Sequence, residues 1–134
     1  MCGWFFYYVF SNTKQEELME LSASNTVILV TRNGMGDSYT TLQQSLIVKY
    51  FSLLNENNIL PSVICFYTDG VKLAVTGSPV LDQLRELERK GVHLILCGTC
   101  LAFYELTDQV QVGIVGGMTD IIEAQFRASK VISI

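Results

Sequence analysis

The chain has 134 residues, a net charge of −4 and a hydrophobic content of 49%. This length suits one domain with a sizeable core, and the acidic balance argues against a surface for nucleic acid or anionic membranes. No stretch approaches the roughly 18 apolar residues that a membrane-spanning helix needs. The apolar start, MCGWFFYYVF, lacks the basic residues and the cleavage site of a signal peptide. We therefore expect a cytoplasmic protein.

The first 25 residues differ in composition from the rest of the chain. Segment 4–10, WFFYYVF, is rich in aromatic residues, and a polar, acidic stretch follows it over 11–25. This composition predicts a strand and a linker, residues 1–25, ahead of a domain that covers 26–134.

From residue 26 onward, short apolar segments alternate with helical patterns. Continuous apolar runs rich in β-branched residues are typical of parallel strands that are covered on both faces. Strands are expected at 26–31, 62–67, 92–97, 112–115 and 131–134. The alternation predicts an α/β fold: a three-layer α/β/α sandwich around a mainly parallel five-stranded sheet.

The first helix is predicted over 38–56. Asp37 or Ser38 can cap its start, because either side chain can accept a hydrogen bond from the first turn. The residues expected on its inner face recur at helical spacing and are Leu42, Leu46, Tyr50 and Leu53.

Two further helices are predicted downstream. One has Ser78 as its cap and Pro79 in its first turn, and it ends at Gly91. The other covers 119–129 and begins with Thr119 as its cap. The expected inner faces are formed by Val80, Leu84 and Leu87 in the first of these helices, and by Ile122 and Phe126 in the second.

The loops that follow the strands are the candidate functional region. Ligands of parallel α/β sheets bind outside the carboxyl ends of the strands. The loops expected at that edge are 32–38, 68–78, 97–100 and 116–119. One of them contains the motif CGTC, so its two cysteines are expected at the functional edge.

The chemistry of CGTC depends on Cys97, Cys100 and the segment after them, where we expect a helix to begin. Amides at a helix N-terminus lower the pKa of a nearby thiol, and the thiolate is the reactive form. Gly98 allows a close turn, and Thr99 supplies a hydroxyl. A zinc site needs four ligands, and the only histidine, His93, lies four residues upstream. We therefore expect neither a metal nor a cofactor.

Several segments together resemble a known family. GVKLAVTGSPVLDQLRELERKGVHLILCGTCLAFYEL, with VILVTRNGMGD before it and VGIVGGMTDIIEAQFRASKVI after it, resembles the C-terminal domain of YedF-type selenium-metabolism proteins. These belong to the DsrE/F-like group of sulfur-relay proteins. The resemblance covers about residues 26–134 and implies a layered α/β/α fold and a homo-oligomer.

The resemblance also implies a site and partners. In that group, the cysteine after the third core strand carries sulfur as a persulfide, and Cys97 stands at that position. A small sulfur-carrier domain of the TusA type precedes the domain in YedF-type proteins, and GWFFYYVF resembles its last strand. The implied partners are sulfur donor and acceptor proteins, among them a TusA-like domain.

Three functions remain open at this point. The first is a sulfurtransferase-like carrier of sulfur, or of selenium, in which Cys97 holds the persulfide and Cys100 resolves it. The second is a thiol–disulfide oxidoreductase, since CxxC at a helix start is also the redoxin arrangement. The third is a non-catalytic module that binds a partner through an apolar edge. Reach at the end of a strand favours Cys97 as the carrier, whereas the helix dipole favours Cys100.

Two basic residues and the aromatic segment complete the predictions. Arg32 and Lys72 are expected at the same edge, where a cation can support a thiolate, although such residues are more often simply solvated. The high hydrophobic content favours a homo-oligomer, with segment 4–10 as one contact.

Overall fold

The computed structural model of the chain describes residues 25–134, and within them five strands form one sheet. The sheet order is β4-β3-β2-β1-β5, and every neighbouring pair of strands is parallel. The strands are β1 (Thr26–Val30), β2 (Val63–Phe66), β3 (His93–Cys97), β4 (Ile114–Gly116) and β5 (Lys130–Ser133). The predicted parallel five-stranded sheet is confirmed. Segment 4–10, predicted to be a strand, lies outside the described residues.

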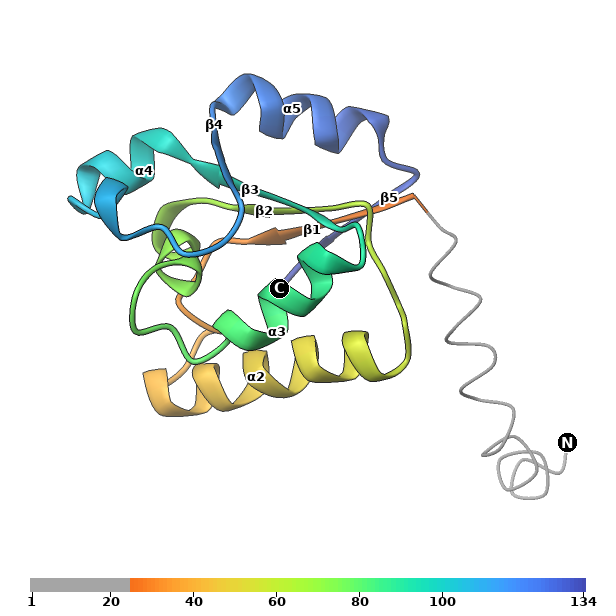
Figure 1. The fold of residues 1–134 in the computed structure, drawn as a ribbon, viewed down its shortest axis with the longest axis horizontal. Helices are drawn as coiled ribbons and strands as arrows, with labels where there is room; N and C mark the ends of the chain where they lie inside the picture. Colours follow the sequence, from red (N-terminus) through yellow and green to blue (C-terminus); the bar gives the residue numbers. More distant parts are fainter. Residues whose placement is uncertain (1–24) are drawn as a thin grey trace, which may run out of the picture.

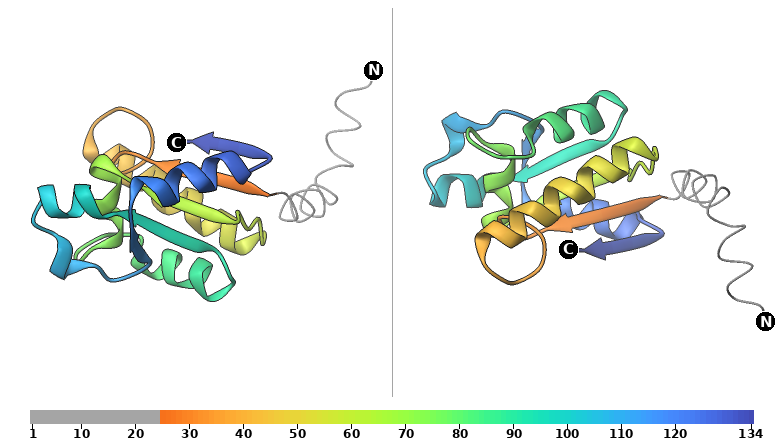
Figure 2. Two further views of the ribbon diagram at one scale, coloured as in Figure 1. Left: turned by 90° about the horizontal axis from the view of Figure 1, so that it is seen from above. Right: turned by 90° about the horizontal axis from the view of Figure 1, so that it is seen from below.

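The helices lie on both faces of this sheet. Helices α2 (Thr40–Glu56) and α3 (Leu81–Arg89) cover one face, and α5 (Met118–Arg127) covers the other (Figure 1). The views from above and below show the same three layers (Figure 2). Among the remaining helical elements, the 3-10 segment η1 (Thr68–Ala74) follows β2 and helix α4 (Gly98–Phe103) follows β3, whereas the 3-10 segment η2 (Thr107–Gln109) lies between α4 and β4. No helix within residues 25–134 is both long and apolar enough to cross a membrane.

Burial explains why the central strands have continuous apolar runs. All five residues of β1 are buried, because helices cover both sides of the sheet there. In β2, residues 64–66 are buried as well. The edge strands β4 and β5 have the same kind of sequence but keep exposed side chains, with Ile114 66% exposed.

Helix α2 begins later than predicted and turns a different face inward. Its N-cap is Tyr39, with no side-chain cap, in place of Asp37 or Ser38. The side chains that it buries are Ile47, Phe51 and Leu54. The predicted Leu42, Leu46 and Leu53 are exposed, and Tyr50 is half-buried. Both rows of residues recur at helical spacing, so packing against the sheet decides which of them faces inward.

Helix α5 differs from its prediction in the same way. Its N-cap is Gly117, not Thr119, and the Asp120 carboxylate accepts the Gly117 N–H at 2.9 Å. The buried side chains are Ile121 and Ala124, whereas Ile122 and Phe126 are exposed. The helix therefore presents its larger apolar side chains to solvent.

Helix α3 buries the predicted face but begins later than predicted. Its N-cap is Val80, with no side-chain cap, in place of Ser78, so Pro79 precedes the helix. The Ser78 hydroxyl accepts the backbone N–H of Val80 at 3.2 Å, and the chain turns at Gly91 with φ of +102°. The predicted inner residues, Val80, Leu84 and Leu87, are all fully buried. A strongly one-sided sequence explains this success, because only one face of α3 is apolar.

Gly70 allows η1 to lie directly on the end of β1. A Cβ atom at position 70 would come within 2.0 Å of the Val30 carbonyl oxygen, so only glycine fits there. This close approach brings Thr68 beside the chain that leaves β1, where its hydroxyl oxygen lies 2.6 Å from the Thr31 carbonyl oxygen. The contact therefore holds the loop after β2 at the carboxyl edge of the sheet.

We expect Gly70→Ala to lower the free energy of unfolding by about 2 kcal/mol or more, because the new methyl group collides with backbone atoms. Gly117→Ala is the matched control, since no atom lies within 4 Å of its Cβ position and its φ is −109°. Urea unfolding followed by circular dichroism measures both. Equal losses of stability in the two variants would contradict the close-approach argument.

Candidate functional site

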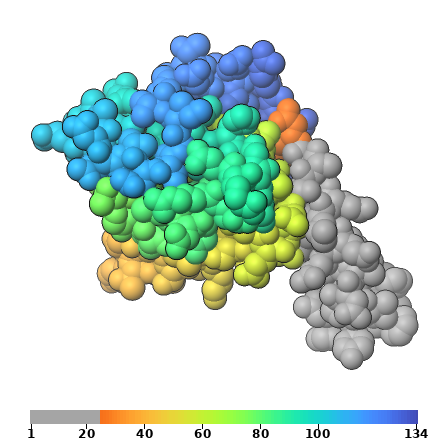
Figure 3. Space-filling view, viewed as in Figure 1, coloured from red at the N-terminus to blue at the C-terminus, as the bar shows by residue number. Residues whose placement is uncertain are grey.

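The two cysteines of CGTC lie where β3 ends. Cys97 is the last residue of β3 and also the N-cap of α4, which begins at Gly98. Helix α4 and η1 both lie at the carboxyl edge of the sheet (Figure 1). In the space-filling view, the segment from α4 to β4 forms one end of the molecule (Figure 3). The predicted location of the pair, before a helix and at the end of a strand, is therefore what the structure shows.

Cys97 is the N-cap of α4, but its side chain makes no capping hydrogen bond. The backbone and side-chain groups of Cys100 and Thr99 can donate hydrogen bonds to the Cys97 thiolate once it forms. Burial raises the pKa of Cys97, but these hydrogen bonds to the thiolate outweigh burial, so its pKa lies below the usual value. Cys97 is thus the thiol of the pair that ionises more readily.

Cys100 has the opposite character. Burial and the hydrogen bond and charge of Cys97 raise the pKa of Cys100, and the Thr68 N–H, which donates to its sulfur at 3.0 Å, lowers it in part. The first proton to leave the pair therefore comes from Cys97, and Cys100 is then the thiol that can donate to the Cys97 thiolate.

The exposures of the two cysteines reverse the argument made from the sequence. Cys97 is only 3% exposed, whereas Cys100 is partly exposed. The N-cap position gives Cys97 the stabilised thiolate, which the helix dipole was expected to give to Cys100. Solvent access, which was the reason for choosing Cys97 as the sulfur carrier, is greater at Cys100. The assignment of Cys97 as the sulfur acceptor stays a prediction, supported by ionisation in place of access.

A polar cluster adjoins Cys100. Tyr104 follows Cys100 by four residues, so both lie on the same side of α4. The Tyr104 hydroxyl donates a hydrogen bond to the Asp69 carboxylate, which raises the pKa of Tyr104 and lowers that of Asp69. The Lys72 ammonium is 3.3 Å from Asp69 Oδ1 and 4.4 Å from the centre of the Tyr104 ring. Lys72 is therefore neutralised by Asp69 and does not pair directly with a thiolate.

The other predicted site residues are placed as follows. Gly98 starts α4 close to β4, since a Cβ atom there would lie 3.2 Å from Val115 Cγ1. The backbone and the side chain of Thr99 both contribute to lowering the pKa of Cys97. Arg32 is exposed in the loop after β1, and within residues 25–134 no hydrogen bond links it to either cysteine.

Thr68, Asp69 and Tyr104 are site residues that the sequence reasoning missed. Thr68 and Asp69 immediately follow the residue after β2, which places them at the carboxyl edge. Tyr104 lies one helical turn after Cys100. These two positional signals could have been read from the sequence, but the contacts across 32 and 35 residues could not.

The remaining cysteine and the histidine lie away from the pair. Cys65 is fully buried within β2, and burial raises its pKa to about 11. His93 stands at the opposite end of β3 from Cys97. Among residues 25–134, no group of three or more His, Cys, Asp or Glu side chains is placed to hold a metal ion.

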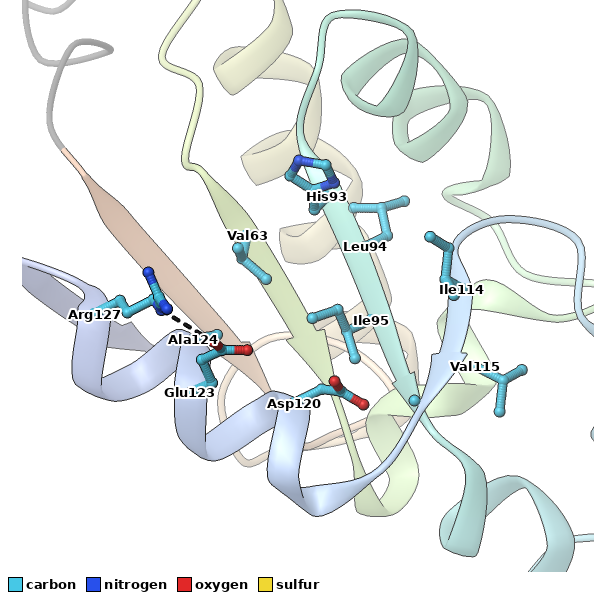
Figure 4. A pocket seen from close by; sticks show the side chains of 11 residues that line it. Val63, His93, Leu94, Ile95, Ile114, Val115, Asp120, Glu123, Ala124 and Arg127 are labelled. Carbon is cyan, nitrogen blue, oxygen red and sulfur yellow. Dashed lines mark hydrogen bonds and ion pairs between the residues drawn. The ribbon is translucent and has the colours of Figure 1, made fainter.

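A second surface feature, which we call the α5 groove, lies between α5 and strands β3 and β4. It has a volume of about 400 Å³ and is lined by Val63, His93, Leu94, Ile95, Ile114, Val115, Gly116, Asp120, Glu123, Ala124 and Arg127. Figure 4 shows apolar side chains of the strands facing α5, where Glu123 and Arg127 form an ion pair at 3.1 Å. Gly116, which lines the groove, pairs with Cys97 across the sheet, but neither cysteine lines the groove.

Comparison with known proteins identifies the fold and the family. A model of the DsrE/DsrF-like family matches residues 24–134. The YchN protein of E. coli is similar in structure, with a TM-score of 0.62 and 16% identity, over 82% of this chain and 99% of that one. A protein of unknown function from Methanobacterium thermoautotrophicum has a TM-score of 0.60 and 20% identity, over 81% and 97% of the two chains. A conserved protein of unknown function from Bacteroides thetaiotaomicron has a TM-score of 0.60 and 17% identity, over 84% and 97%. No curated protein matches the chain significantly.

We expect Cys100→Ala to raise the pKa of Cys97, because the variant removes the thiol that donates to the Cys97 thiolate. The measurement is the thiolate ultraviolet absorbance as a function of pH, taken as the difference between each protein and the same protein with Cys97→Ser. Cys2→Ser is the control and should leave the Cys97 curve unchanged. A Cys97 curve that Cys100→Ala does not shift would show that the two thiols are not coupled.

Proposed function

The chain belongs to the DsrE/DsrF-like family, and we propose that it is a sulfur carrier in which Cys97 accepts sulfur as a persulfide. One observation carries the proposal: where β3 passes into α4, CGTC places a buried thiol whose pKa is lowered, Cys97, three residues before a partly exposed thiol whose pKa is raised, Cys100. A sulfur carrier needs a thiolate to receive the sulfur atom and a way to release it, and the pair supplies both.

Loading requires a nucleophile. The Cys97 thiolate attacks the outer sulfur of a donor persulfide, the donor's sulfur–sulfur bond breaks, and the donor leaves as a thiolate. The outer sulfur, with its proton, stays on Cys97 as a persulfide. Hydrogen bonds from Thr99 and Cys100 keep Cys97 ionised for this step, although they also reduce its intrinsic nucleophilicity.

Delivery of the sulfur atom to an acceptor also depends on stabilisation of the Cys97 thiolate. The thiolate of an acceptor attacks the outer sulfur of the Cys97 persulfide, and Cys97 leaves as a thiolate. A thiol with a low pKa is the better leaving group in thiol exchange. The N-cap position of Cys97 therefore favours release of sulfur to an acceptor.

Cys100 provides a second route of release and also a competing function. Its thiolate can attack the inner sulfur of the Cys97 persulfide, which forms a Cys97–Cys100 disulfide and expels hydrosulfide. Because Cys97 and Cys100 are three residues apart and each shifts the pKa of the other, the same pair supports a thiol–disulfide oxidoreductase as a second candidate function.

The finer resemblance to YedF-type proteins extends the proposal. Residues 70–106, which include CGTC, support this resemblance. If the chain functions as a YedF-type protein, a TusA-like domain is its sulfur donor or acceptor. Selenium could then take the place of sulfur, because a selenide follows the same exchange steps. A reducing cytoplasm would keep both thiols free for this chemistry.

We expect the full chain to gain the mass of one sulfur atom after brief treatment with glutathione persulfide. Cys97→Ser should gain none, while Cys100→Ser should hold the added sulfur about tenfold longer than the wild type, since the intramolecular release route is gone. Cys2→Ser is the control and should behave as the wild type. Intact and peptide mass spectrometry measure all four proteins.

The other outcomes of this experiment each select a different reading. Sulfur on Cys97→Ser but not on Cys100→Ser would reverse the roles of the two cysteines. A loss of two hydrogens with no added sulfur at any time would favour the oxidoreductase. If the mass of none of the four proteins changes, the non-catalytic partner-binding module is the function that remains.

We also propose that the chain forms a homo-oligomer through β4 and α5. Exposed apolar side chains gather on these two elements; they are Ile114, Val115, Met118, Ile122 and Phe126. Exposed apolar residues on adjoining elements are typical of an interface between proteins. This surface lies within the described residues, whereas the contact predicted from the sequence, segment 4–10, lies outside them.

Phe126→Glu is expected to shift the sedimentation coefficient of the full chain towards that of a monomer, because a charge is introduced on this apolar surface. Tyr39→Glu is the matched control, since both side chains are 85% exposed and Tyr39 lies at the start of α2. Analytical ultracentrifugation measures both variants. A monomeric wild-type protein at working concentration would rule out the oligomer.

A further inference from the structure

Thr68 has a backbone conformation that its residue type rarely adopts. Its φ is +49°, in the left-handed region, where β-branched residues are strongly disfavoured. Such conformations persist only where neighbouring groups hold them, and they concentrate at functional sites. The contacts of Thr68 show what holds it and what the conformation achieves.

The Thr68 side chain holds its own backbone in place. Its hydroxyl oxygen lies 2.6 Å from the Thr31 carbonyl oxygen and 2.7 Å from the Tyr67 carbonyl oxygen. Its donor is thus directed at the ends of β1 and β2 together. Gly70 lets the segment lie directly on Val30, and the Tyr67 N–H donates to the Val30 carbonyl oxygen at 3.1 Å. The left-handed turn is therefore tethered from both sides.

The tethered conformation directs the Thr68 N–H at a sulfur atom. This N–H donates to Cys100 Sγ at 3.0 Å, and the Cys100 thiol is a group that can donate to the Cys97 thiolate. A hydrogen bond accepted by the Cys100 sulfur polarises the thiol that Cys100 donates, so the two bonds strengthen each other. Thr68, which lies just after β2, thereby acts on Cys97 at the end of β3 and Cys100 in α4.

We propose that Thr68 is a positioning residue of the thiol pair, whose backbone N–H fixes the Cys100 sulfur against Cys97 and supports the negative charge on Cys100 when it resolves the persulfide. The proposal rests on the proposed sulfur-carrier function for its chemical step. In that step Cys100 first loses its proton to water, and its thiolate attacks the inner sulfur of the Cys97 persulfide. The Cys97–Cys100 bond forms, the bond to the outer sulfur breaks, and hydrosulfide leaves with the electron pair.

Cys100 is the group on which the Thr68 N–H acts. Its other titratable neighbours are Cys97 from β3, Asp69 and Lys72 from η1, and Tyr104 at the end of α4. In the alkylation test, Cys97 is replaced by serine in every protein and the other three are left unchanged. In agreement with the geometry, the hydrogen bond from Thr68 lowers the pKa of Cys100 against the opposing effects of burial and Cys97.

Three variants separate the tether from the backbone conformation. Thr68→Ser keeps the hydroxyl. Thr68→Gly loses the hydroxyl but tolerates a positive φ. Thr68→Val keeps the β-branched shape and loses the hydroxyl, so its backbone should leave the left-handed region and carry the N–H away from Cys100.

The first measurement is the pH dependence of iodoacetamide alkylation at Cys100, in the full chain with Cys97→Ser and with the product located by peptide mass. We expect Thr68→Val to raise the apparent pKa of Cys100 by about one unit, a tenfold change in the ionisation constant. Thr68→Ser should leave it unchanged and Thr68→Gly nearly so. Urea unfolding of each variant confirms that the protein is folded at the assay conditions.

The second measurement is hydrosulfide release after treatment of the single Thr68 variants with glutathione persulfide. We expect Thr68→Val to slow the release about tenfold, as for loss of a hydrogen bond to a charged group, and Thr68→Ser to release at the wild-type rate. Equal alkylation profiles for Thr68→Val and Thr68→Ser would overturn the positioning role. If no protein forms a persulfide, the sulfur-carrier function fails, while the alkylation profiles still decide whether Thr68 acts on Cys100.

Discussion

Cys97 is at once the last residue of β3 and the N-cap of α4, and the rest of the site depends on this double position. As a strand residue it pairs with Gly116 of β4, which fixes its backbone within the sheet. As the N-cap it precedes the first backbone N–H groups of α4, which the helix cannot satisfy internally and which lower the pKa of Cys97. No loop separates the strand from the helix, so the sulfur is held rigidly where the sheet ends.

Two close backbone approaches complete the arrangement. Gly98 lets α4 start against Val115 of β4, and Gly70 lets η1 lie on the Val30 carbonyl of β1. Side chains at either position would push apart elements that meet at the carboxyl edge. Because both approaches are made, a hydrogen-bond donor from the β2 loop reaches a thiol on α4. Packing of the sheet and chemistry of the thiols are therefore linked through backbone contacts.

The two thiols of CGTC differ in solvent exposure and in how readily they ionise. Cys97 is buried and ionises readily, while Cys100 is partly exposed and keeps its proton. Access and reactivity thus lie on different cysteines, which suits a relay in which one sulfur holds the cargo and the other releases it. The structural neighbours are at most 20% identical, so they establish the fold, and the function rests on the site itself.

The sequence by itself determined the parallel α/β fold, the inner face of α3 and the position of CGTC at the functional edge. Continuous apolar runs and a one-sided helix leave few alternatives, and a cysteine at the end of a strand must meet that edge. Only the tertiary structure decided the inner faces of α2 and α5, because neighbouring rows of apolar residues in each helix were equally periodic. It also decided which thiol is buried and joined Thr68 to Cys100 and Asp69 to Tyr104, since hydrogen bonds between distant segments depend on how the strands and helices pack.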